Sequence, residues 1–237
     1  MNLPSISVPY FITTIPSTKE EIHFRPFLVK EEKILLMALT GEDEASMNDA
    51  IENILNVCIR EDIDIKKLSY YDIEYLFLKI RSKSVGEIIE LNLKTHSCVE
   101  TCKPIEYKLN IDEVNVKFND DHTNKIMITD EIGVMLKYPD YRKLQEIGKK
   151  FADNNIETIF QVVIDCIECI FDQETVYDQA SEKELNEFLE GLNSQQFQKL
   201  IKFFQTMPKL SHTLKYKCNT CGTDDELLLE GLKSFFL

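Results

Sequence analysis

The chain has 237 residues, enough for one domain with a substantial core or for two small ones. Its hydrophobic content of 43% and charged content of 29% are ordinary for a folded protein, and only seven Gly and seven Pro argue against long low-complexity segments. The 41 acidic and 27 basic residues give a net charge of −14, which opposes the phosphate contacts on which nucleic-acid binding depends. We therefore expect no nucleic-acid partner.

A membrane span is not expected either. The most apolar stretch, residues 156–171, is interrupted by Gln161, Asp165 and Glu168, whereas a span needs about 18 apolar residues in a row. The first residues lack the basic start and long apolar run of a signal peptide. We expect the protein to be cytosolic.

Extended structure is expected at the start of the chain, because the prolines of residues 1–29 exclude a continuous helix. Residues 10–15 and 22–25 have the β-branched and aromatic character of strands, and residues 16–19 have that of a turn. These patterns predict a short hairpin.

Helical spacing follows this hairpin. Three helices are expected, at residues 30–39, 44–60 and 71–82. Gly41 is placed to cap the end of the first helix, and Ser69 to cap the start of the third. In the second helix Ile51, Leu55 and Cys58 share one face, so Cys58 is expected to be a core residue.

After Gly86 the apolar period changes from helical to alternating. Residues 88–93 and 105–111 are predicted to be strands, joined through the turn that contains Cys98 and Cys102. The polar stretch at residues 115–124 is expected to join two lobes, and residues 126–138 are expected to be extended.

The second half of the chain is predicted to be mostly helical. Helices are expected at residues 141–151, at 155–171, after the capping box of Ser181 and Glu184, and at 193–206. Strands are then expected on both sides of a turn at Cys218 and Cys221, and the apolar end of the chain must be covered by the fold or by another chain.

These elements predict an α+β fold. A lobe of mixed strands and helices at residues 1–124 would carry the first cysteine turn. A mainly helical lobe at residues 125–237 would end in the second cysteine turn, whose hairpin packs back on the first lobe. The two lobes are expected either as separate units or as one continuous domain.

The seven cysteines hold the main chemical signal. In a reducing compartment close cysteine pairs favour a metal site over a disulfide. Cys98 and Cys102 lie in one turn between strands, and Cys218 and Cys221 in another, so four thiolates can form a tetrahedral Zn²⁺ site. Gly222 fits this interpretation because it can adopt the positive φ that closes such a turn. Such a zinc ion would be structural, because protein ligands fill all four positions.

Two alternatives to this zinc site remain open. The turns can instead hold free thiols, since the spacing from Cys98 to Cys102 is one residue longer than in the usual knuckle. His96 and His212 are possible replacement ligands, although each is also an ordinary strand residue. A third pair, Cys166 and Cys169, falls inside a predicted helix and is interpreted as core packing rather than as a redox site.

Signatures of common enzymes are absent from the sequence. It contains no Gly-x-Gly-x-x-Gly, no Gly-Lys-Ser/Thr phosphate loop, no Gly-x-Ser-x-Gly and no His-Glu-x-x-His. Its four histidines stand in unrelated contexts. No catalytic residue and no organic cofactor is therefore predicted.

The order of elements resembles the baseplate hub proteins of T-even-like contractile-tailed bacteriophages. The segments that carry the likeness are Glu21-Ile-His-Phe-Arg-Pro-Phe, Lys30-Glu-Glu-Lys-Ile-Leu, residues 68–86, Leu136-Lys-Tyr-Pro, Phe203-Phe-Gln-Thr-Met-Pro-Lys-Leu, and Cys218-Asn-Thr-Cys221-Gly with residues 229–236. The resemblance implies a non-enzymatic structural or chaperone-like assembly protein that binds other hub or tail proteins. It would act in the host cytoplasm during assembly, and it leaves open whether the protein stays in the virion baseplate.

Two other functions remain open at this point. One is a zinc-ribbon adaptor that binds host or phage transcription machinery, for which salt-sensitive DNA or polymerase binding is expected. The other is an enzyme of unrecognised type, which would need a pocket with perturbed carboxylates.

Overall fold

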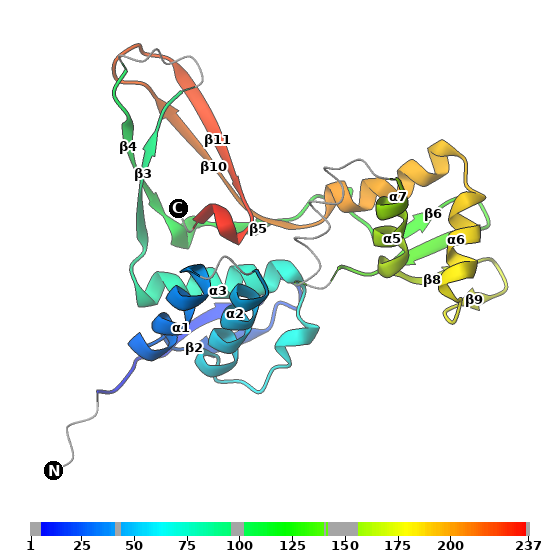
Figure 1. Cartoon of the computed structure of the whole chain (residues 1–237), viewed down its shortest axis with the longest axis horizontal. Coiled ribbons are helices and arrows are strands. Elements are labelled where there is room, and N and C mark those ends of the chain that lie inside the picture. Colours follow the sequence, from blue (N-terminus) through cyan, green and yellow to red (C-terminus); the bar gives the residue numbers. More distant parts are fainter. Residues whose placement is uncertain (1–5, 41–43, 96–101, 140, 142–155, 236–237) are drawn as a thin grey trace. The chain divides into compact units, whose positions relative to one another are not determined.

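The computed structural model describes residues 6–40, 44–95, 102–139, 141 and 156–235 (Figure 1). Contacts within the chain form two units, one of residues 1–117 with 209–237 and one of residues 118–208. We call them unit 1 and unit 2. Helices and short antiparallel sheets mix in the chain, which confirms the predicted α+β class. The proposed lobe boundary between residues 124 and 125 stays a prediction.

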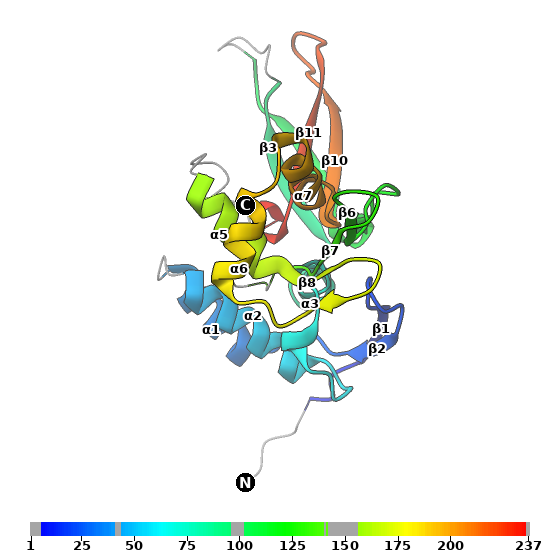
Figure 2. The ribbon, with the colours of Figure 1, turned by 90° about the vertical axis from the view of Figure 1, so that its right-hand side faces the viewer.

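Unit 1 begins with a hairpin of β1 (Phe11–Thr14) and β2 (Glu21–Phe24), which pair antiparallel as the sequence predicted. The Ile15 N–H donates to Glu20 O at 2.9 Å, and Lys19 adopts φ 63° in the turn. The Asp72 carboxylate accepts the Ser17 N–H at 2.9 Å, which places the hairpin beside a helix (Figure 2).

Three α-helices and one short 3-10 turn follow the hairpin. They are α1 (Val29–Thr40), α2 (Glu44–Cys58), η1 (Ile65–Lys67) and α3 (Tyr70–Ser84). Apolar residues at helical spacing bury α2 and α3 against each other: Ile51, Ile54, Leu55, Leu76, Phe77 and Ile80 are all at most 1% exposed. The three predicted helices and the core position of Cys58 are confirmed. The proposed cap at Gly41 lies outside the described residues.

Two antiparallel hairpins complete the sheets of unit 1. The first pairs β3 (Ile88–Leu93) with β4 (Ile105–Asn110), and the short η2 (Ile111–Glu113) follows it. The second pairs β10 (Lys209–Lys217) with β11 (Asp224–Glu230). In addition β10 pairs with β5 (Asn115–Lys117), where Lys209 is opposite Lys117. The terminal hairpin therefore returns to the unit that holds the N-terminal elements, as predicted.

The last described turn of unit 1 is covered by the fold of the unit. The last turn, η3 (Leu232–Phe235), buries Leu232 and Phe235 to 2% and 1% exposure. The Leu232 N–H donates to Glu74 Oε1 of α3 at 3.1 Å. This contact joins η3 to α3.

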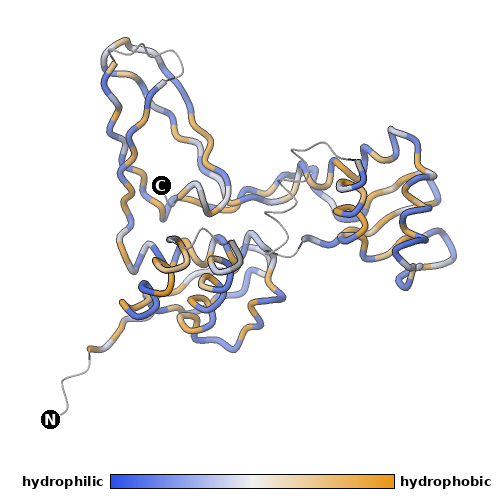
Figure 3. The backbone as a smooth tube through the Cα atoms, viewed as in Figure 1, coloured by the Kyte–Doolittle hydropathy of each residue, from blue (hydrophilic) through white to orange (hydrophobic). Residues whose placement is uncertain are grey.

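Unit 2 contains a four-stranded antiparallel sheet and three described helices. The strands lie in the order β6 (Lys125–Met127), β7 (Gly133–Leu136), β8 (Ile167–Phe171) and β9 (Val176–Tyr177), and the helices are α5 (Ile156–Cys166), α6 (Glu182–Glu190) and α7 (Ser194–Thr206). The apolar stretches of β7 and β8 stand out in Figure 3. Val134, Leu136, Val163 and Leu200 are fully buried around them.

Two predicted helices need comment. The prediction that residues 155–171 form one helix is wrong beyond Cys166, because Ile167–Phe171 is strand β8 and pairs with β7 and β9. The predicted helix at residues 141–151 lies outside the described residues, apart from Tyr141. The helices after Ser181 and Asn193 are confirmed, and both begin with capping boxes.

The polar stretch before β6 is held inside unit 2 by a histidine. His122 Nε2 lies 3.0 Å from the Tyr138 hydroxyl oxygen, and His122 Nδ1 lies 2.9 Å from Thr206 Oγ1. The ring also packs against Phe203 at a centroid distance of 5.1 Å. Burial lowers the pKa of His122, so this histidine is a neutral structural link.

Candidate metal centre

The second cysteine turn connects β10 to β11 in a compact loop. The Cys218 N–H donates to Thr223 O and the Gly222 N–H donates to Cys218 O, both at 2.8 Å. Gly222 has φ +75°, the left-handed conformation expected of it from the sequence. This backbone turns Cys218 and Cys221 toward one point.

The first cysteine turn contributes Cys102 to the same point. The Sγ atoms of Cys102, Cys218 and Cys221 all lie within 4.8 Å of one another. The β3–β4 and β10–β11 hairpins lie near each other at this end of unit 1 (Figure 1), where the Tyr216 hydroxyl is 3.3 Å from Lys94 O. The thiol cluster therefore joins two hairpins that are about 120 residues apart in the sequence.

The cluster could hold a metal ion. Four sulfur ligands at the usual Zn–S distance of about 2.3 Å lie about 3.8 Å apart, so small side-chain rotations bring the three thiols to tetrahedral positions. Cys102 and Cys218 are 3% and 1% exposed, and Cys221 is exposed. Hydrogen bonds with Thr223 lower the pKa of the Cys221 thiol, which favours the thiolate that a metal requires. The structure thus brings together three of the four cysteines that the sequence predicted as ligands.

The other candidate ligands have different outcomes. Cys98 and His96 lie outside the described residues. His212 lies in β10 and pairs with Leu229 of β11. A strand rises about 3.3 Å per residue, so His212 is roughly 20 Å along β10 from Cys218 and is not part of the cluster. The assignment of Cys98 as fourth ligand stays a prediction.

The third cysteine pair is separated by the end of a helix. Cys166 is the last residue of α5 and is 1% exposed, whereas Cys169 is half-buried in β8. The prediction that both lie within one helix is wrong for Cys169, but core packing fits Cys166. A thioredoxin-like site places its pair after a strand and at a helix start, which is the reverse of this order.

Two buried carboxyl groups of unit 1 accept backbone N–H groups. Burial raises the pKa of Asp72, whose carboxylate accepts backbone N–H groups from Ser17 and Ser69. Burial also raises the pKa of Glu74 to about 7, and this carboxyl group accepts the Leu232 N–H. Each of these carboxyl groups binds backbone donors, and Lys19 also acts electrostatically on Asp72, so both have the geometry of structural links.

One surface feature of unit 2 was not predicted. A groove of about 610 Å³ lies beside β9 and α6. The sequence interpretation missed it because residues 167–171 were assigned to a helix and no strand was expected at residues 176–177. The run Ile167-Glu-Cys-Ile-Phe171 is mostly apolar and suits a buried helix as well as a buried strand, so its spacing alone does not decide for β8.

Comparison with known families gives the chain its identity. A family model described as T4 bacteriophage base plate protein matches residues 8–237. The chain belongs to this family. The match extends across the β1–β2 hairpin, both cysteine turns and unit 2 of this base plate protein. No curated protein and no solved structure matches it. Within the part that the structure describes, no helix is long and apolar enough to cross a bilayer.

Proposed function

We propose that this base plate protein is a non-enzymatic structural or chaperone-like assembly protein of the hub of a contractile phage tail, and that it acts by binding other hub or tail proteins. The family match over residues 8–237 carries the proposal. The net charge of −14 supports protein partners over nucleic acid. Assembly would take place in the host cytoplasm, and the baseplate of the virion is the destination that the family implies.

The thiol cluster has a supporting role in this function. We propose that Zn²⁺ bound by Cys98, Cys102, Cys218 and Cys221 clamps the β3–β4 hairpin to the β10–β11 hairpin. The support is the approach of three of these Sγ atoms to within 4.8 Å. A closed four-ligand site leaves no position for substrate, so the metal would stabilise the binding surface rather than catalyse a reaction.

Co-expression tests the binding role. The full chain is produced together with each baseplate protein of the same phage, and complexes are isolated through a tag on the chain and sized by chromatography. We expect a stable complex with at least one central baseplate protein and none with the major capsid protein, which serves as the control. Failure to bind any tail protein would refute the proposal.

A titration with duplex DNA at two salt concentrations separates this function from a transcription adaptor. A hub protein is expected to show no salt-sensitive DNA binding, because its surface is acidic. Binding that weakens steeply between 50 and 200 mM salt, roughly 10³-fold for six phosphate contacts, would favour the adaptor instead.

A further inference from the structure

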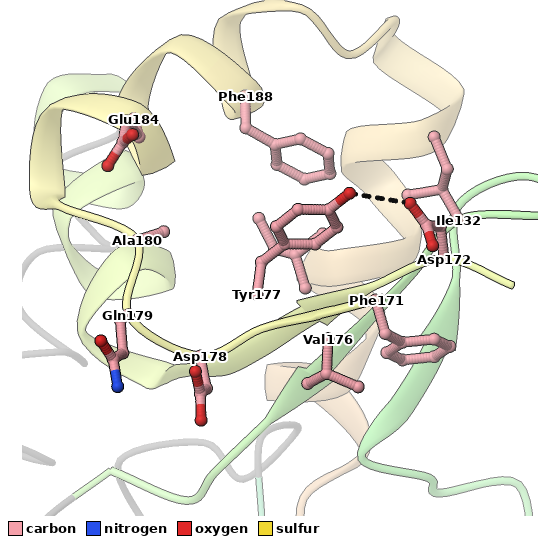
Figure 4. A pocket seen from close by; sticks show the side chains of 11 residues that line it. Ile132, Phe171, Asp172, Val176, Tyr177, Asp178, Gln179, Ala180, Glu184 and Phe188 are labelled. Carbon is pink, nitrogen blue, oxygen red and sulfur yellow. Dashed lines mark hydrogen bonds between the residues drawn. The ribbon is translucent and has the colours of Figure 1, made fainter. Parts of the chain in front are cut away.

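The groove beside β9 exposes apolar side chains that the fold leaves uncovered. Val176 and Tyr177 of β9 are 62% and 48% exposed, and Ile132 is 36% exposed. Figure 4 shows the Tyr177 ring facing Phe188 of α6 across the groove. The Tyr177 hydroxyl donates to Asp172 Oδ2 at 2.9 Å, which fixes the ring in this position. The two rings give the groove an aromatic surface against which an apolar side chain can pack.

The groove has charge of one sign. Asp172, Asp178 and Glu184 are among its lining residues, which include no Lys, Arg or His. Two of the carboxylates also have local partners, since Asp172 accepts the N–H groups of Glu174 and Thr175 and Glu184 accepts the Ser181 N–H. These hydrogen bonds lower the pKa values of Asp172 and Glu184, so both remain anionic at neutral pH.

Asp178 differs from the other two acids. It is exposed and, among the described residues, makes no hydrogen bond or ion pair. It follows directly after β9, which is the last strand of the four-stranded sheet. In the described part of the chain no cation competes for this carboxylate, and an extended partner segment that lies along β9 passes next to it.

We propose that this groove binds a short segment of a partner protein that presents one or two large apolar side chains flanked by Lys or Arg. The apolar side chains pack against the Tyr177 and Phe188 rings. Cations at alternate positions of the segment pair with Asp178, whose side chain points with Val176 to the side opposite Tyr177 (Figure 4), and with Glu184. The inference rests on the proposed function in that the chain works by binding proteins, and it adds the chemistry of one partner segment. All charged residues of the lining are acidic, which favours a basic segment over an acidic or neutral one.

The test uses the full chain and a defined probe. A fluorescein-labelled peptide Lys-Lys-Phe-Leu-Lys-Lys is titrated with the protein and followed by fluorescence anisotropy, and the same peptide with Glu in place of each Lys is the control. Binding of the basic peptide is expected to weaken roughly five- to twenty-fold in D178K, because one attractive rim charge becomes repulsive.

E190K is the matched variant. Glu190 lies on α6, two residues beyond Phe188, and therefore points away from the groove, yet its replacement changes the net charge by the same amount. We expect E190K to bind the basic peptide as the wild type does. The proposal is overturned if the wild type does not bind the basic peptide, if it binds the acidic peptide equally well, or if D178K and E190K weaken binding alike.

Sedimentation velocity of the chain alone addresses another occupant. We expect D178K and Y177A to leave the sedimentation of the free protein unchanged. A dimer that Y177A converts to monomer would assign the groove to a second copy of the chain and overturn the proposal. The co-expression experiment tests the proposed function independently of the groove. If the D178K variant still forms a complex with a hub protein, the proposed function stands, and the peptide titration alone decides whether the groove binds a basic segment.

Discussion

Replacing Glu74 with Gln should remove most of a pH dependence in the stability of unit 1. Glu74 is 7% exposed in α3 and accepts the Leu232 N–H at 3.1 Å. Burial raises its pKa from 4.5 to about 7. The folded protein then holds this proton more tightly than the unfolded chain does, so the free energy of unfolding falls as pH rises from below 4.5 to above 7.

The size of the effect follows from these two values. Each pH unit between them corresponds to about 1.4 kcal/mol, so the full loss is roughly 3 kcal/mol, of which roughly 2.5 kcal/mol falls between pH 5 and pH 8. In Glu74→Gln the amide oxygen still accepts the Leu232 N–H, but the side chain no longer titrates. The variant should therefore gain stability relative to wild type by that amount as pH rises.

Urea unfolding at pH 5, 6, 7 and 8 measures this difference. Tyrosine fluorescence is a suitable probe, because the chain has nine Tyr and no Trp. Glu226→Gln, at an exposed position of β11, is the control and should follow the wild type. If wild type and Glu74→Gln have parallel pH profiles, the reasoning about the buried carboxyl group is wrong.

Three further outcomes are expected. Cys218→Ser should lose bound zinc and lower the melting temperature, whereas Cys169→Ser should keep the metal; elemental analysis and thermal scans measure both, and equal zinc in the two variants would contradict the proposed site. Gly133→Ala should destabilise unit 2 by roughly 1–3 kcal/mol in urea unfolding, because the new methyl group would overlap the Phe171 ring. Asn193→Ala should cost about 1 kcal/mol by removing the side chain that caps α7, while Asn193→Asp, which still caps, should cost much less in the same assay.

The local structure could be predicted where one pattern dominates. Ser181 with Glu184 is a capping pair whose meaning depends only on neighbouring residues, and α6 begins where this pair predicts. The change from helical to alternating spacing after Gly86 likewise predicts the β3–β4 hairpin.

The misses come from interactions between distant segments. Residues 155–171 have apolar residues that suit either a buried helix or a buried strand. Ile170 pairs with Val134 of β7 on one side and with Tyr177 of β9 on the other, and this pairing stabilises a strand rather than a helix after Cys166. No local spacing contains these partners, so the groove that depends on β8 and β9 could not be predicted either.

The cysteines of the candidate metal centre could be predicted from the sequence, because pairs of cysteines in turns between strands are typical of metal sites. The sequence indicated which four residues to combine, and the structure brings Cys102, Cys218 and Cys221 together. It could not exclude His212, because the register of β10 depends on pairing with β11.

The pairing of Lys117 with Lys209 has a consequence for how the molecule forms. The polypeptide leaves unit 1 at the end of β5 and re-enters it directly opposite, after all of residues 118–208. A disordered excursion of that length would make this pairing entropically costly, while a folded one holds its ends closer together. Unit 2 should therefore become structured first on the nascent chain, and the β5–β10 ladder should close only after the final strands have been synthesised.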